Sequence, residues 1–222
     1  METLRVILVE DEDLFRGMLA DSVAKDPALE VTGAYGSSDE ALSQTFSPPP
    51  DVAVLDIVLE GGMNGVDLGI ALRKRYPSMG IVLLSNHRNP SFLTALDPSN
   101  AAGWSYLCKR TVRDAETVRR TIQGTAMGLV VLDSELLAAL RPRVNSRISR
   151  LPPRRYELLQ EIALGYTNAG IATRLGISVK TVENQINLLY RDLNIDTSDP
   201  TLQPRVQAVR LFLDETRSTD LN

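Results

Sequence analysis

Short apolar runs alternate with amphipathic stretches along the first half of the chain. The strongest of these runs are rich in Val, Ile and Leu, and they end at polar residues. They predict buried strands at 4–9, 51–56, 80–85 and 103–108, with a weaker strand at 30–35. Helical periodicity lies between them, at 12–25, 38–46, 65–76 and 113–128. Five strands that alternate with helices predict an α/β domain with a doubly wound, parallel five-stranded sheet.

Prolines set some of these boundaries. Pro48, Pro49 and Pro50 follow the helix at 38–46, and Pro77 follows the next one. In the helix at 113–128, Val118, Ile122 and Thr125 fall on one face. A further helix around 90–97 is expected to be brief, because Pro98 cuts it short.

After about residue 128 the strand signal stops and the pattern becomes helical. Residues 129–150 contain one short helical piece, 134–140, followed by the linker-like sequences Arg-Pro-Arg and Asn-Ser. Four helices are then expected at 153–164, 168–175, 179–193 and 205–214. We therefore predict three parts, namely a first domain at 1–128, a linker with a short helix at 129–150, and an all-α four-helix domain at 151–216.

The composition agrees with two modest globular domains. The chain has 222 residues, of which 43% are hydrophobic and 23% charged. No apolar run approaches the roughly 18 residues of a membrane span, and the N-terminus lacks the basic region of a signal peptide. The lone Cys108 argues against internal disulfides and fits a reducing, cytoplasmic location. The lone His87 argues against a histidine zinc site or a Ser-His-Asp hydrolase.

The net charge of −4 conceals an asymmetry between the two halves. Residues 1–128 hold 12 Lys and Arg against 17 Asp and Glu, a balance of −5. Residues 141–191 hold nine basic residues against three acidic ones, a balance of +6. The basic segment is either a solvated linker with surface arginines or a surface for a negatively charged partner.

Polar residues gather at the predicted carboxyl ends of the strands, where open parallel sheets place their chemistry. They are Glu10, Asp11, Asp56, Ser85 and Lys109. Converging carboxylates repel one another, and a divalent cation and an ammonium group would relieve that repulsion. Oxygen ligands alone favour Mg²⁺. Taken singly, Asp11 is equally well explained as a helix cap and Lys109 as a solvated loop residue.

This half resembles the receiver domain of two-component response regulators, which has a flavodoxin-like fold. The matching residues are V-E-D-E at 9–12, L-D-I at 55–57, L-L-S at 83–85 and Y-L-C-K at 106–109. The resemblance implies that Asp56 accepts a phosphoryl group from a sensor histidine kinase. It implies Mg²⁺ held by Asp11, Asp56 and the Val58 carbonyl with help from Glu10, and a phosphoryl-binding and switch set of Ser85, Tyr106 and Lys109.

Two departures keep alternatives open. Asn86 follows Ser85 where receivers usually have a very small residue, and the loop after Asp56 is one residue longer and lacks the usual proline. A receiver that no longer senses phosphate, in a regulator controlled by a ligand or by dimerisation, is the first alternative. A Mg²⁺-dependent phosphatase is the second, although Val58 stands where its acid/base aspartate would be. We expect that the chain is not an enzyme.

Residues 168–193 predict a helix-turn-helix. Gly176 stands where a helix end needs a left-handed residue, and Ser178 is placed to cap the next helix. That helix has a core stripe of Val182, Ile186, Leu189 and Leu193. Its opposite stripe carries hydrogen-bond donors suited to DNA, namely Lys180, Asn184, Asn187 and Arg191. An ordinary amphipathic surface helix is the alternative.

The segment resembles the LuxR-type helix-turn-helix of NarL/FixJ-class response regulators. The matches include L-G-I-S at 175–178, K-T-V-E-N at 180–184 and R-V-Q-A-V at 205–209. The resemblance implies a transcription regulator that binds double-stranded DNA, as a homodimer when active, through Ser178, Lys180, Thr181, Glu183, Asn184, Asn187 and Arg191. Pro152 and Arg155 replace the usual capping box, and Gly170 lies inside the scaffold helix. The last helix either contacts a second copy or packs on its own domain.

Overall fold

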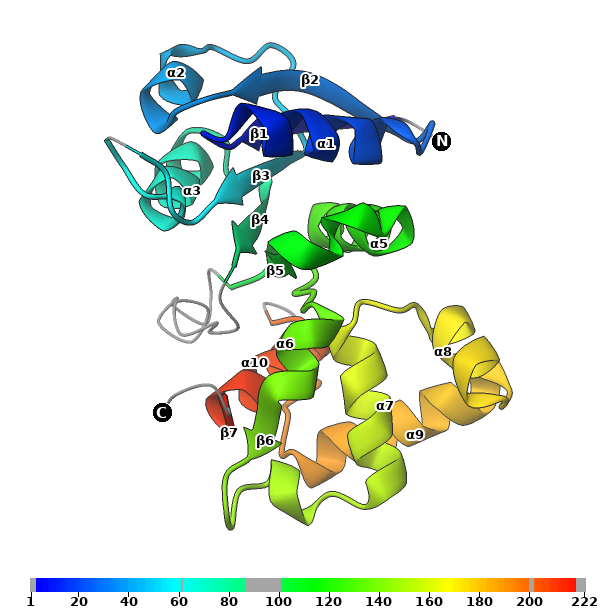
Figure 1. Cartoon of the computed structure of the whole chain (residues 1–222). Coiled ribbons are helices and arrows are strands. Elements are labelled where there is room, and N and C mark those ends of the chain that lie inside the picture. The colour runs from blue at the N-terminus through cyan, green and yellow to red at the C-terminus, as the bar shows by residue number, and fades with distance from the viewer. Residues whose placement is uncertain (1–2, 61, 87–100, 200–201, 219–222) are drawn as a thin grey trace. The chain divides into compact units, whose positions relative to one another are not determined.

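The structure is a computed structural model that describes residues 3–60, 62–86, 101–199 and 202–218 (Figure 1). The described residues form two compact units. Residues up to 86 and from 103 to 129 make the first, and residues 101–102 with those from 130 onward make the second. The first unit contains the predicted parallel sheet, and the second contains the predicted helices of the C-terminal half.

The sheet of the first unit has five parallel strands in the order β2-β1-β3-β4-β5. The strands are β1 Leu4–Val9, β2 Leu29–Tyr35, β3 Val52–Asp56, β4 Gly80–Ser85 and β5 Trp104–Cys108. All five strands predicted from the apolar runs are confirmed, including the weak one. Strand order reverses at β1, so the carboxyl ends of β1 and β3 flank the crevice where such sheets bind ligands.

Helices cover both faces of this sheet. Helices α1 (Asp13–Ala24) and α5 (Ala115–Ala126) contact each other, as do α2 (Ser38–Ser43) and α3 (Gly65–Arg75). The core beneath α1 and α5 includes Leu19 and Val23 from one helix and Val118 and Ile122 from the other. Strand residues alternate between the two faces, and all the residues of β3 and β4 are buried.

Two helix boundaries differ from the prediction. Helix α2 ends at Ser43, before the prolines, because Gln44 is already extended and the Ser43 hydroxyl donates to the Glu40 carbonyl (2.7 Å). Residues Lys109–Arg113 form a 3₁₀ turn, η2, so α5 begins only after Asp114, whose side chain caps it. The helix expected at 90–97 lies outside the described residues.

The second unit contains the helices predicted for the C-terminal half. They are α6 (Ser134–Ala139), α7 (Pro153–Ala163), α8 (Asn168–Leu175), α9 (Val179–Asp192) and α10 (Pro204–Asp214). Helix α10 packs on α7 through the rings of Tyr156 and Phe212, whose centroids are 6.0 Å apart. Val206, Val209 and Leu213 of α10 are buried. No helix among the described residues is long and apolar enough to span a membrane.

The expectation of no strands after residue 128 is wrong at two short segments. Strand β6 (Leu140–Pro142) pairs antiparallel with β7 (Thr216–Ser218). The Arg143 N–H extends the pairing by donating to the Glu215 carbonyl (2.8 Å). Segments of three residues carry no periodic signal, and these two pair only because α10 returns the chain to the linker region.

Candidate functional site

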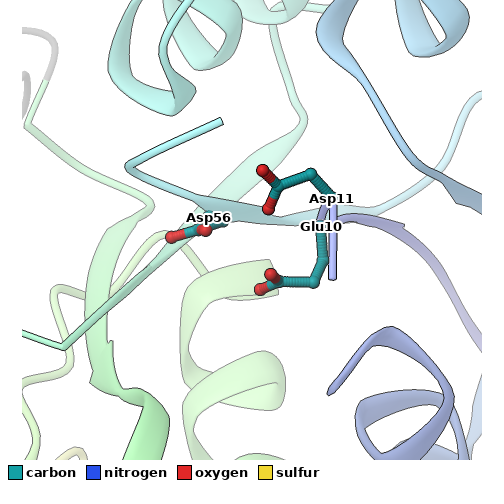
Figure 2. A group of neighbouring side chains, drawn as sticks. All are labelled: Glu10, Asp11 and Asp56. Atoms are coloured by element: carbon teal, nitrogen blue, oxygen red, sulfur yellow. The ribbon is translucent and has the colours of Figure 1, made fainter. Parts of the chain in front are cut away.

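Three carboxylates meet at the carboxyl edge of the sheet. Glu10 and Asp11 follow β1, and Asp56 ends β3. One ligand oxygen from each lies within 4.8 Å of the others, and Figure 2 shows the three side chains converging. Glu10 and Asp56 are buried, whereas Asp11 is partly exposed. The structure therefore brings together the acidic residues that the sequence placed at this edge.

Lys109, directly after β5, bridges two of these carboxylates. Its Nζ donates to Glu10 Oε1 (2.8 Å) and to Asp56 Oδ2 (2.9 Å). The same ammonium lies 4.8 Å from the centroid of the Phe15 ring, a cation–π contact that holds it over α1. Lys109 is thus a fixed counter-charge inside the cluster, which answers the alternative of a solvated loop residue.

Burial and mutual repulsion make ionisation of the clustered carboxylates unfavourable. Burial raises the pKa of Glu10 and the pKa of Asp56, and hydrogen bonds from Lys109 offset only part of that rise. The neighbouring Asp56 charge also raises the pKa of Glu10, and Asp11 does the same to Asp56. Partial burial alone would lower the pKa of Lys109, but hydrogen bonds to Glu10 and Asp56 raise it. The site disfavours full ionisation without a further cation.

The donor set fits Mg²⁺. The candidate side-chain ligands are all carboxylate oxygens, which hard cations prefer. Glu10 Oε2 lies 2.8 Å from Lys109 Nζ but accepts no hydrogen bond in the part of the chain that the structure describes. A buried oxygen with a free lone pair suits a water of the ion's shell, the role that the receiver resemblance gives Glu10.

Main-chain hydrogen bonds hold the loop after Asp56 against the cluster. The Val58 N–H donates to Asp56 Oδ1 (3.2 Å), and the Glu60 N–H donates to Asp11 Oδ2 (3.0 Å). The Met63 N–H donates to the Ser38 hydroxyl (3.0 Å). The Val58 side chain is exposed, so this residue touches the site through its main chain. The Val58 and Glu60 N–H groups therefore hold the described start of this loop against the acidic cluster.

The residues of the implied switch lie on adjacent strands. Ser85 ends β4, Tyr106 lies within β5, and both are buried. In the register of β4 and β5, Ser85 stands opposite Cys108 and Leu83 opposite Tyr106. Asn86 is exposed and lines a cavity of about 360 Å³ with Lys109 and the side chains of α1 and η2. His87 lies outside the described residues.

The second unit contains a helix-turn-helix formed by α8 and α9. Gly176 ends α8 in the left-handed conformation (φ +65°), as predicted. The Ile177 N–H then donates to the Ala172 carbonyl (3.0 Å), which closes the helix end. Ser178 caps α9 by accepting from the Thr181 N–H (3.0 Å). The turn and cap signals in the sequence are thus realised as hydrogen bonds.

Helix α9 has one buried and one exposed side. Val182, Ile186, Leu189 and Leu193 are buried, as the periodicity predicted. Lys180 Nζ lies 3.4 Å from Glu183 Oε2, so the acid near the expected DNA face is partly neutralised by its neighbour. The implied DNA-binding residues are exposed, namely Ser178, Lys180, Thr181, Glu183, Asn184, Asn187 and Arg191.

Arg205 was not singled out from the sequence as a site residue, yet it anchors the motif. Its guanidinium donates to the Tyr166 carbonyl and to Asn168 Oδ1 at the start of α8. Burial lowers the pKa of Arg205, offset in part by Tyr190. Only the R-V-Q-A-V match pointed to this position, because a buried contact between distant segments leaves no local pattern.

Comparisons with known proteins agree with both halves. Residues 6–114 match the response regulator receiver domain, and residues 149–200 match the bacterial regulatory proteins of the luxR family. DevR/DosR of Mycobacterium tuberculosis, a DNA-binding transcriptional activator, is 31% identical over 199 residues, or 87% of this chain and 89% of that protein. VraR of Staphylococcus aureus, a response regulator protein, is 28% identical over 211 residues, or 93% and 95%.

The chain belongs to the response regulator family. Its receiver followed by a LuxR-type helix-turn-helix places it in the NarL/FixJ class. The fold of this response regulator is also that of the RcsB response regulator of Salmonella typhimurium. The two share 20% identity with a TM-score of 0.52, over 91% of this chain and 97% of that one.

Proposed function

We propose that this response regulator is a transcription factor whose DNA binding is controlled by phosphorylation of Asp56. The observation that carries the proposal is the contact of Lys109 Nζ with Asp56 Oδ2 (2.9 Å) beside two further carboxylates. A sensor histidine kinase supplies the phosphoryl group, and the active form is a homodimer. The regulator works in the cytoplasm, where its DNA partner is present and where a reducing environment keeps its single thiol reduced.

The chemistry is transfer of a phosphoryl group to a carboxylate. An Asp56 oxygen attacks the phosphorus of the phosphohistidine, the P–N bond breaks, and its electron pair returns to the imidazole. When bound, Mg²⁺ neutralises charge on the transferring oxygens. Asp11, Asp56 and the Val58 carbonyl would hold the ion, with Glu10 acting through a water, while Lys109 and Ser85 would donate to the remaining phosphoryl oxygens.

Phosphorylation adds negative charge and acceptor oxygens to a site that already holds three carboxylates. Ser85 and Tyr106, on adjacent strands, transmit the change to the neighbouring face of the first unit. That face then favours the dimer, which presents two copies of α9 to paired half-sites. The exposed donors Lys180, Asn184, Asn187 and Arg191 suit phosphates and base edges.

Beryllofluoride with Mg²⁺, which mimics the phosphoryl group, tests the proposal. Its addition should shift the chain toward dimers, protect DNA near the chain's own gene in footprinting, and change the fluorescence of Trp104, which is buried in β5. The Asp56→Asn variant should show none of these responses. A wild-type chain that responds in none of the three assays would instead favour a receiver that does not sense phosphate.

A further inference from the structure

Six arginines precede and open helix α7. They are Arg141, Arg143, Arg147, Arg150, Arg154 and Arg155, and the first acidic residue after them is Glu157. This segment begins the basic stretch 141–191, and it lies outside the helix-turn-helix of α8 and α9. Such a concentration of one charge makes a locally positive surface potential, which attracts a negatively charged partner.

Three of these arginines fasten the segment to the helix-turn-helix. Arg147 Nη1 donates to the Leu193 carbonyl at the end of α9 (3.1 Å), and Arg155 Nε lies 3.0 Å from Asp192 Oδ2. Arg154 Nη2 donates to the Leu175 carbonyl at the end of α8 (3.3 Å). Side chains of residues 147–155 therefore reach both the end of α9 and the end of α8.

The segment is held in place from its other side as well. Arg147 Nε donates to Glu215 Oε1 (2.7 Å), and the Ile148 N–H donates to the second oxygen of that carboxylate (3.2 Å). The strand pair β6–β7 lies just upstream. Residues 147–150 are thus tied to the rest of the second unit, so the backbone that carries their side chains is held in place.

The side chains of Arg150 and Arg154 on this segment are exposed to solvent, although Arg154 also makes the contact with Leu175 described above. Arg150 is exposed, and it has no ion pair or side-chain hydrogen bond with the residues that the structure describes. The side chain of Arg154 is 52% exposed, although it contacts Glu157 at 3.3 Å.

We propose that Arg150 and Arg154 form a second DNA-contacting surface, which binds phosphates that flank the site read by α9. This inference rests on the proposed DNA-binding function and extends it. The 14 residues of α9 span about 21 Å, whereas duplex DNA carries a phosphate charge about every 1.7 Å along its axis. A duplex seated on α9 therefore continues past the ends of the helix, toward the segment that lies beside them.

Salt dependence of binding to a short mixed-sequence DNA duplex tests the proposal in the full-length chain. Each of Arg150→Ala and Arg154→Ala should lower the slope of log binding constant against log salt by about one, and the double variant by about two. At 0.1 M salt each single variant should bind roughly fivefold to tenfold more weakly. Both effects should be independent of the duplex sequence, because phosphates carry no sequence information.

Two controls separate the outcomes. Lys74→Ala removes an equally exposed cation from the first unit and should leave the slope unchanged, which excludes an effect of net charge alone. Lys180→Ala should lower the slope by about one. If Lys180→Ala lowers the slope and the arginine variants do not, the second surface is refuted while DNA binding stands. If the wild-type chain does not bind the duplex, the proposed function itself fails.

Discussion

Gly65 lies directly against the main-chain carbonyl of Asp56: a Cβ on residue 65 would sit 1.9 Å from that oxygen. Gly65 is the first residue of α3, and its N–H donates to the Ile57 carbonyl (3.1 Å). The absence of a side chain at this position therefore sets how closely α3 approaches the loop that carries Asp56.

Gly65→Ala should displace Asp56 and weaken the acidic site. Because the clash is with backbone, relief requires a shift of the loop or of α3, which should cost about 1–3 kcal/mol of unfolding free energy. The variant should also bind Mg²⁺ more weakly. Urea denaturation and a Mg²⁺ titration followed by Trp104 fluorescence measure the two effects.

Gly17→Ala is the matched control for that substitution. Gly17 lies inside α1, and a Cβ there would meet nothing within 4 Å. Alanine should therefore stabilise the chain by about 0.5–1 kcal/mol through helix propensity and leave Mg²⁺ affinity unchanged. Equal losses in both variants would show that the approach of Gly65 to Asp56 has no special importance.

The raised pKa of Asp56 has a consequence for stability. Burial holds the folded-state pKa above its unfolded value, so the protonated form is favoured in the folded state. The stability that this provides is present below the unfolded pKa, and it is lost as the pH rises through the folded pKa. Without Mg²⁺, Asp56→Asn should unfold at higher urea concentration than wild type near pH 7.

This advantage of Asp56→Asn should shrink as the pH falls from 7 through the raised folded pKa of Asp56. It should be gone below about 4, the usual range of an aspartate, because wild-type Asp56 is then protonated in both the folded and the unfolded state. Asp21→Asn, at an exposed position of α1, changes the net charge equally and should show no such pH-dependent gain. A variant that is less stable than wild type at pH 7 would mean that the ion pair with Lys109 outweighs burial.

Mg²⁺ should stabilise the wild-type chain at neutral pH, because it relieves the repulsion among Glu10, Asp11 and Asp56. At a concentration of 100 times the dissociation constant the gain is about 2.7 kcal/mol. Thermal melts with Mg²⁺ and with a chelator measure the gain. Asp11→Asn should reduce the gain strongly, and a gain of equal size in that variant would place the ion elsewhere.

The sequence predicted most of the fold because its signals are local. Each strand is a compact apolar run, and the turn around Gly176 and Ser178 depends on two residues whose conformations are set by their own chemistry. The acidic site was also predictable, since Glu10, Asp11, Asp56 and Lys109 all stand at strand ends, and a parallel sheet brings strand ends together.

Contacts between distant segments could not be predicted in this way. The pairing of β6 with β7 and the attachment of Arg205 to Asn168 join parts of the chain that have no shared pattern. The end of α2 at Ser43 depends on a side-chain hydrogen bond that competes with the helix. In the first two cases the contacting residue is distant in the sequence. In the third, Ser43 could equally have continued the helix, and the local sequence does not decide between the two.

The ion pair of Arg147 with Glu215 should stabilise the second unit in a pH-dependent manner. Partial burial acts to raise the pKa of Glu215. Hydrogen bonds from Arg147 and the Ile148 N–H lower it by more than burial raises it, so the pKa of Glu215 lies below the usual value. The stability of such a group is present above the unfolded pKa and is lost as the pH falls through the folded pKa.

Glu215→Gln should therefore lower the unfolding free energy at pH 7 by about 1–2 kcal/mol. The difference from wild type should close as the pH falls below about 4. Amide hydrogen exchange in α10 measures the effect locally. Glu157→Gln, at an exposed pair with Arg154, is the control and should change stability by less than about 0.5 kcal/mol. A constant difference at all pH values would attribute the loss to packing.

Substitution by alanine should have opposite effects on stability at Gly170 and at Gly176 of the helix-turn-helix. Gly170 lies inside α8, and a Cβ there would meet Tyr166 Cδ1 at 3.4 Å, an ordinary contact, so Gly170→Ala should stabilise the chain by about 1 kcal/mol. Gly176 has open space around it but adopts φ +65°, so Gly176→Ala should destabilise the chain by about 1–2 kcal/mol. Urea denaturation of the two variants measures both changes. If Gly176→Ala is neutral or stabilising, the open space around residue 176, and not its backbone conformation, decides the outcome at the turn.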